Sequence, residues 1–173
     1  NDFSSGYPKE LDRVADRIEP TPMLGWHARK KSDFFNHYNR LAGELAMEAR
    51  LDPWRLQVQT CLVSGVNFDE GTNLDAIAHT VDEMIKRITS QYAKRGINEK
   101  PFVFVKSNAG TYGMGIMKVD SGSEILQMNR RTKNKMAVVK NNLKVHEVIV
   151  QEGIPTRFQL EGGYSEPVIY MFG

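Results

Sequence analysis

Apolar residues repeat with a helical period in three stretches of the chain. In residues 8–19 they stand three and four positions apart, which predicts an amphipathic helix. From about residue 31 to 50 a second run predicts a longer helix, for which Ser32 can serve as N-cap. Its apolar stripe consists of Phe34, Tyr38, Leu41, Leu45 and Ala49. The clearest period covers residues 74–94, and Gly96 just beyond is typical of a helix end.

Shorter segments have the composition of β-strands. Residues 55–64 are rich in Leu, Val and Thr, and residues 145–151 are rich in β-branched side chains. Residues 101–105 form a continuous apolar run, typical of a strand buried on both faces, and residues 116–119 predict a short return strand. Residues 123–140 lie between the strand predicted at 116–119 and the strand predicted at 145–151. They are basic and are expected to be partly helical.

The order of these elements predicts an α/β (α+β) fold in two portions. We expect an N-terminal α/β portion at residues 1–96 and a C-terminal α+β portion at residues 97–173, with a seam near residues 96–100. The sequence lacks an initiator Met and stops just after residues 167–171, which resemble a strand. A sheet would normally continue there, so we expect an incomplete chain.

The composition of the chain argues against a nucleic-acid-binding protein and against a membrane-spanning one. The 173 residues include 23 basic and 21 acidic side chains, a net charge of +2, which does not favour nucleic-acid binding. The single cysteine, Cys61, lies in an apolar run where a small buried side chain is expected, and we favour a reducing, cytoplasmic setting. No apolar stretch approaches the roughly 18 residues that a membrane helix needs, so no membrane partner is expected.

A lysine followed by glycines is the most informative motif. Lys106 ends the apolar strand, and Gly110, Thr111, Gly113 and Gly115 follow it. Glycines let the backbone adopt positive φ and point several N–H groups at phosphate oxygens, while the ammonium and the hydroxyl add donors. The alternative is a hairpin turn with a solvated lysine. The spacing matches neither a Walker loop nor a dinucleotide-binding fingerprint, and it leaves a glycine hairpin covering phosphates as the nucleotide-binding interpretation.

A second polar motif ends the last predicted strand. There Gln151 and Glu152 are followed by Gly153 and Ile154, and then by Pro155. A strand that ends in a polar pair and a turn can line an adenine pocket.

Together the lysine strand, the glycine hairpin and the Gln-Glu-x-Ile strand resemble the ATP-grasp pattern over roughly residues 101–172. The chain resembles the proteobacterial glutamate-cysteine ligases even more closely than it resembles the general ATP-grasp pattern. The segments that carry this similarity are residues 25–32, 52–54, 101–117, 148–156 and 166–171.

This resemblance implies an ATP-dependent ligase that joins the γ-carboxylate of L-glutamate to the amine of L-cysteine through an acyl phosphate, the first step of glutathione synthesis, with ATP and Mg²⁺ as cofactors. It implies that Lys106 contacts ATP phosphate, that residues 110–115 cover the phosphates, and that residues 151–154 form the adenine hinge. Glu152 and Glu166 become the expected acidic contacts to the nucleotide. The family takes Mg²⁺ from late-strand acidic and asparagine side chains, and no such pair can be placed before Gly173, so no metal ligand is identified.

A polar and aromatic cluster precedes the long predicted helix. It contains Trp26, His27, Arg29, Lys31 and Ser32, together with Lys30. These side chains suit an amino-acid carboxylate or a phosphate, although a solvated helix start has equal weight.

Two other functions stay open at this point. One is an ATP-grasp ligase with another acceptor amino acid, and the other is a non-catalytic nucleotide-binding module. Glutamate, cysteine and ATP are the expected small-molecule partners, and a homo-oligomer is left open. The basic run at residues 129–144 has no stacking aromatic side chain, which favours a solvated face or a flap over ATP rather than an RNA site.

Overall fold

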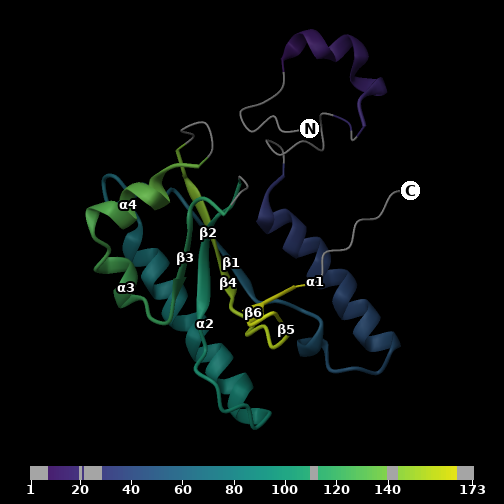
Figure 1. Ribbon diagram of the computed structural model, residues 1–173, viewed down its shortest axis with the longest axis vertical. Coiled ribbons are helices and arrows are strands. Elements are labelled where there is room, and N and C mark those ends of the chain that lie inside the picture. The colour runs from purple at the N-terminus through teal and green to yellow at the C-terminus, as the bar shows by residue number, and fades with distance from the viewer. Residues whose placement is uncertain (1–7, 20, 22–28, 110–112, 140–143, 167–173) are drawn as a thin grey trace.

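Four strands form one antiparallel sheet at the centre of the protein (Figure 1). The computed structural model describes residues 8–19, 21, 29–109, 113–139 and 144–166. The strands lie in the order β1-β4-β2-β3, and their bounds are Thr60–Ser64, Glu147–Glu152, Val103–Ser107 and Ile116–Val119 in that order. The sheet and its helices confirm the predicted mixed α/β class.

Three helices cover one face of this sheet (Figure 1). They are α2 at Leu74–Lys94, α3 at Ser123–Leu126 and α4 at Arg130–Ala137. Helix α2 has the bounds that the apolar period predicts, and the basic segment is partly helical as expected. The fully buried core consists mainly of aliphatic side chains from α2 and the strands, including Ile77, Val81, Met84, Ile88, Val103, Val105, Val148 and Val150. Cys61 packs against this core but is only partly buried, less than the apolar run around it predicts.

Strand β2 is buried on one face only, and the prediction of a strand buried on both faces is wrong. Val103 and Val105 belong to the core under α2, whereas Phe104 and Lys106 alternate with them and are half-buried on the opposite face. The period of two places every second side chain on that face. We call it the open face, because β1 is the strand of the sheet that helix α1 (Lys31–Glu48) mainly contacts on this side, whereas α2 packs across β1, β4 and β2 on the other.

Helix α1, Lys31–Glu48, lies on the side of the sheet opposite α2 and starts and ends within two residues of the prediction (Figure 1). It buries Ala42 and Ala46, whereas Phe34 and Leu45 on the predicted stripe are 61% and 56% exposed. The N-cap prediction is wrong: Ser32 lies inside the first turn, and Lys30 occupies the cap position without a side-chain cap bond. The helix docks through its small residues, which permit a close approach.

The first predicted helix is a 3-10 helix, η1, at Lys9–Arg17, with none of its residues buried. The strand predicted at 55–64 starts only at Thr60, because Pro53–Arg55 form a short 3-10 helix, η3, capped by the Asp52 side chain. A small hairpin that the sequence did not predict, β5 at Gln159–Leu160 and β6 at Gly163–Tyr164, follows β4.

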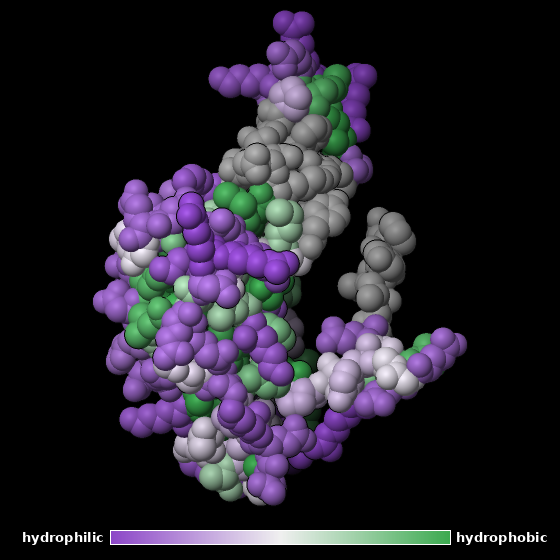
Figure 2. Space-filling model, turned by 60° about the vertical axis from the view of Figure 1, so that its left-hand side comes forward, coloured by the Kyte–Doolittle hydropathy of each residue, from purple (hydrophilic) through white to green (hydrophobic). Residues whose placement is uncertain are grey.

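The predicted strand at 167–171 lies outside the described residues. The division into residues 1–96 and 97–173 stays a prediction, and the described core takes residues from both sides of it. Within the described segments no helix is long and apolar enough to cross a membrane. The face seen in the space-filling view is mostly hydrophilic, with separate hydrophobic patches (Figure 2).

Candidate functional site

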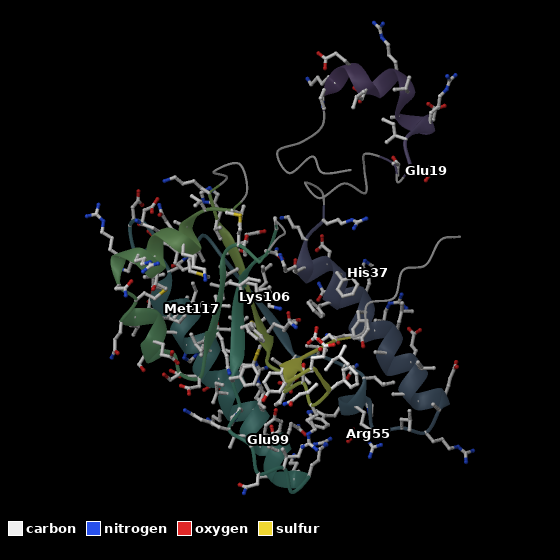
Figure 3. All side chains as sticks on the ribbon, viewed as in Figure 1. Glu19, His37, Arg55, Glu99, Lys106 and Met117 are labelled. Atoms are coloured by element: carbon white, nitrogen blue, oxygen red, sulfur yellow. The ribbon has the colours of Figure 1, made fainter. Side chains whose placement is uncertain are left out.

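Lys106 stands on β2 and projects from the open face of the sheet (Figure 3). Its ammonium Nζ donates a hydrogen bond to Gln151 Oε1, 3.0 Å away on the neighbouring strand β4. Burial lowers the pKa of Lys106, and the negative charge of Glu166 opposes this shift. The half-buried Lys106 ammonium is therefore close to Gln151 and within electrostatic reach of Glu166, two other residues that the sequence singles out.

The glycine segment after Lys106 forms the predicted β-hairpin. Lys106 pairs with Ile116 on β3, and the Ser107 N–H donates to the Gly115 carbonyl at 2.8 Å. Gly113 and Gly115 have φ values of 69° and 60°, the left-handed conformation that glycine adopts without strain. Gly110 and Thr111 lie outside the described residues. Lys106 is thus part of this hairpin, and the connecting loop begins just after Ser107, the last residue of β2.

A second lysine comes to the same end of the sheet from α1. Lys31 Nζ donates to the Ser107 carbonyl at 2.8 Å, directly next to Lys106 in the chain. The pKa of Lys31 is lowered first by burial and then by the positive charge of Lys106. Two half-buried ammonium groups of like charge at one end of the sheet favour an anion there.

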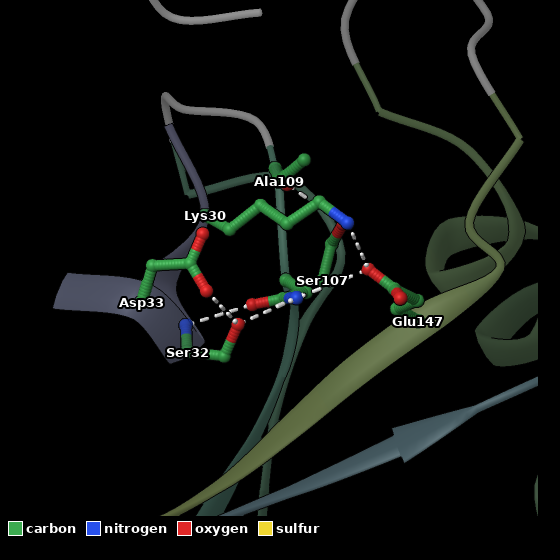
Figure 4. A network of polar contacts seen from close by, with 7 residues as sticks. Lys30, Ser32, Asp33, Ser107, Ala109 and Glu147 are labelled. Carbon is green, nitrogen blue, oxygen red and sulfur yellow. Dashed lines mark hydrogen bonds and ion pairs between the residues drawn. The ribbon is translucent and has the colours of Figure 1, made fainter. Parts of the chain in front are cut away.

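Asn108 connects α1 to this end of the sheet and is 1% exposed. Its Oδ1 accepts a hydrogen bond from the Ser32 backbone N–H at 2.9 Å, and its Nδ2 donates to Ser32 Oγ at 3.0 Å and to Glu147 Oε2 at 3.1 Å. Its own carbonyl accepts from the Lys31 N–H at 2.9 Å. Figure 4 shows the surrounding network, in which Lys30 Nζ also donates to Glu147 Oε2 at 3.0 Å.

Asn108 and Glu147 are the functional candidates that sequence reasoning missed. The available signal was an Asn just after the strand that carries the lysine, a place where a short polar side chain often caps backbone groups. Of the predicted N-terminal cluster, the structure brings Lys31 and Ser32 to the site. Arg29 is exposed, and Trp26 and His27 lie outside the described residues.

At the end of β4 the backbone N–H groups are hydrogen-bonded to other parts of the protein. The Glu152 N–H donates to the Gln59 carbonyl and the Gly153 N–H to the Phe102 carbonyl, both at 2.9 Å. The Glu152 side chain is 5% exposed, and its Oε2 accepts from the Gln59 N–H at 3.1 Å. Burial raises the pKa of Glu152, and the bond from Gln59 partly offsets that shift. Ile154 follows, and 59% of it is exposed.

A pocket of about 320 Å³ opens at this end of β4. Its lining includes Tyr38, Trp54, Tyr92, Glu152, Ile154 and Arg157. The indole Nε1 of Trp54 is buried and has no hydrogen-bond partner among the residues that the structure describes. The pocket therefore combines aromatic walls with polar groups, as sites for flat heterocyclic ligands do.

Glu166 lies within electrostatic reach of Lys106, and its Oε1 accepts a hydrogen bond from Thr156 Oγ1 at 3.0 Å. Over the described ranges, no group of three or more His, Cys, Asp and Glu side chains could hold a metal ion.

A family model and a solved structure match this chain. The family model described as glutamate-cysteine ligase matches residues 1–173. A crystal structure of a Methylobacillus flagellatus KT protein, assigned as a gamma-glutamylcysteine synthetase, is 41% identical in sequence and superposes with a TM-score of 0.73. The match covers 88% of this chain and 36% of that one, so the chain spans about a third of its length. No curated protein gave a match.

Proposed function

Since the chain belongs to the glutamate-cysteine ligase family, we propose that it forms part of an ATP-dependent ligase joining L-glutamate to L-cysteine. The observation that carries the proposal is the meeting of Lys106 and Lys31 beside the glycine hairpin, next to the polar end of β4. Within the proposed enzyme this chain supplies much of the nucleotide site, in an ATP-grasp arrangement.

The phosphates of ATP would lie at the two lysines. Both ammonium groups are half-buried and have already lost part of their hydration, so a bound polyphosphate would remove little further water from the lysines and would gain charge-assisted hydrogen bonds. The pair also sits at the start of the glycine hairpin, where backbone N–H groups can turn toward the same oxygens. This placement favours phosphate over an amino-acid carboxylate as the ligand of Lys31, because one carboxylate would leave the second cation unneutralised.

The adenine base would lie at the end of β4, about three strand residues from Lys106 along the sheet. Glu152 and Gly153 already donate their N–H groups to protein carbonyls, so the hinge offers the Ile154 N–H and backbone carbonyls instead. The adjoining pocket has the aromatic lining that a purine needs. The side chain of Glu152 faces the core and Glu166 stands nearer to Lys106, which makes Glu166 the better candidate for a contact with the nucleotide.

The proposed reaction has two steps. An oxygen of the glutamate γ-carboxylate attacks the γ-phosphorus of ATP, ADP leaves, and an acyl phosphate forms. The cysteine amine then attacks the acyl carbon, loses a proton and releases phosphate as the amide bond forms. The role of Lys106 and Lys31 is to hold the phosphates in line and to offset their charge, which is most of what phosphoryl transfer requires of a protein.

Mg²⁺ is implied by the family resemblance and would supply further charge neutralisation at the phosphates. Two cationic side chains suit the phosphates themselves, whereas the described residues offer no clustered carboxylates for the ion. The ligands of the ion would therefore come from outside the residues that the structure describes.

Calorimetry with ATP on the full-length protein tests the nucleotide site. Lys106→Ala should weaken ATP binding by about 1 to 3 kcal/mol, the range for losing a charged hydrogen bond. Lys86→Ala is the matched control, because Lys86 is an exposed lysine on α2, away from the open face. ATP affinity that is the same in both variants, or no ATP binding by the unmodified protein, would refute the proposal. Assaying phosphate release with cysteine and with other amino acids identifies the acceptor.

A further inference from the structure

We propose that Asn108 is a positioning residue that caps helix α1 from a distant part of the chain and thereby holds Lys31 beside Lys106. The proposal deepens the proposed function, on which its consequence for ATP rests. Its structural part concerns the arrangement of the two lysines and can be tested in the absence of nucleotide.

The first turn of α1 lacks a cap of its own. The N-terminal N–H groups of a helix have no partner inside the helix and are usually satisfied by a polar side chain just before it. Lys30 occupies that position and makes no side-chain cap bond. Asn108 takes over the task from 76 residues away, accepting the Lys31 N–H on its carbonyl and the Ser32 N–H on Oδ1, both at 2.9 Å.

Asn108 is itself fixed in place. Its backbone N–H donates to the Glu147 carbonyl at 3.0 Å, and its Nδ2 is shared between Ser32 Oγ and Glu147 Oε2. Each donor and acceptor of the amide thus has a partner, in a side chain that is 1% exposed. Such a fully satisfied buried network specifies one geometry, because any shift leaves a buried polar group without a partner.

The result of this geometry is the position of Lys31. The residue is the first of α1, and its Nζ reaches the Ser107 carbonyl, one residue before Asn108. Lys30 turns instead to Glu147. Among the charged groups around this turn, Glu147 and Asp33 raise the pKa of Lys30, and Lys106 lowers the pKa of Lys31. Loss of the cap should release Lys31 from Lys106 without changing either lysine.

The experiment measures the pKa of the Lys31 ammonium in nucleotide-free, full-length protein, by NMR of isotope-labelled lysine. Lys106→Ala should raise this pKa, because it removes a neighbouring positive charge. In the Asn108→Ala background the same substitution should leave it unchanged. Asn129→Ala is the matched control, since Asn129 caps α4 by accepting the Thr132 N–H at 2.9 Å, and in that background the response should persist.

ATP affinity supplies the second readout. Asn108→Ala should weaken ATP binding about tenfold, in the range for loss of a charged contact, while Asn129→Ala should not. Asn108→Asp, which keeps an acceptor for the Ser32 N–H, should recover part of the affinity. If the Lys31 pKa still responds to Lys106→Ala without Asn108, or never responds, the positioning role is refuted. If the lysines are coupled through Asn108 but the protein binds no ATP, the proposed function fails and the positioning role stands.

Discussion

Gly153 lies directly against the ring of Phe102: a methyl group at Gly153 would stand 2.1 Å from Phe102 Cε2 and 2.7 Å from the Phe102 carbonyl oxygen. Contacts this short do not occur, so either the ring or the backbone at the end of β4 would have to move. We therefore expect Gly153→Ala to destabilise the fold by about 1 to 3 kcal/mol, the usual range for overpacking. Urea unfolding monitored by circular dichroism measures the effect.

Gly163→Ala is the control for this prediction. Gly163 lies in the β5–β6 hairpin, where the added methyl group would meet its nearest atom, the Leu160 carbonyl oxygen, at an ordinary 3.7 Å. Its substitution should change the free energy of unfolding by no more than about 0.5 kcal/mol. Equal losses from the two variants would show that the contact with Phe102 is not what requires glycine.

The two lysines predict how ATP binding depends on pH. Burial lowers the pKa of both Lys106 and Lys31, and phosphate favours their protonated forms. ATP affinity should therefore fall as pH rises through the lowered pKa values, earlier than an ordinary lysine would dictate. Lys106→Arg should reduce this loss, because an arginine stays protonated throughout the range. Titrations at several pH values measure it, and identical pH profiles for the two proteins would contradict it.

The parts of the fold that are local in sequence were predictable. Helix α2 follows its apolar period from end to end, and Lys106 was identified because a strand and a glycine segment flank it in the chain. Periodicity also found α1, but it could not show that Ala42 and Ala46 would face the protein while Phe34 faces outward. Which side of a helix is covered depends on its neighbours in space.

The contacts of the site could not be predicted for the same reason, because they join residues that are far apart in the sequence. Asn108 caps a helix that begins 77 residues earlier, and Ser32 looked like the cap because it is the nearest polar side chain in the sequence. The sequence left Lys31 open between a carboxylate and a phosphate as its ligand, and it could not show that Lys31 reaches the Ser107 carbonyl next to Lys106. The backbone hinge at residues 151–154 stays a prediction, and the sequence could not show that the Glu152 and Gly153 N–H groups already donate to protein carbonyls.

Glu152 predicts a pH-dependent contribution to stability. Burial raises the pKa of its carboxyl, so the folded protein holds this proton more tightly than the unfolded chain. The stabilisation from the protonated form is fully present below the unfolded-state pKa and is lost as pH rises through the folded-state pKa. At neutral pH the buried, charged carboxylate therefore lowers the stability of the folded protein, although its Oε2 still accepts a hydrogen bond from the Gln59 N–H.

Glu152→Gln should remove that cost, because an amide oxygen can accept the same hydrogen bond without a charge. We expect the variant to be more stable than the unmodified protein at about pH 8, by on the order of 1 kcal/mol, and to lose this advantage toward about pH 4. Urea unfolding at both pH values tests this, with Glu83→Gln on the exposed surface of α2 as the control. A Glu152→Gln variant that is less stable at high pH would mean that the carboxylate charge itself supports the end of β4. The acid would then have a binding partner outside the described residues.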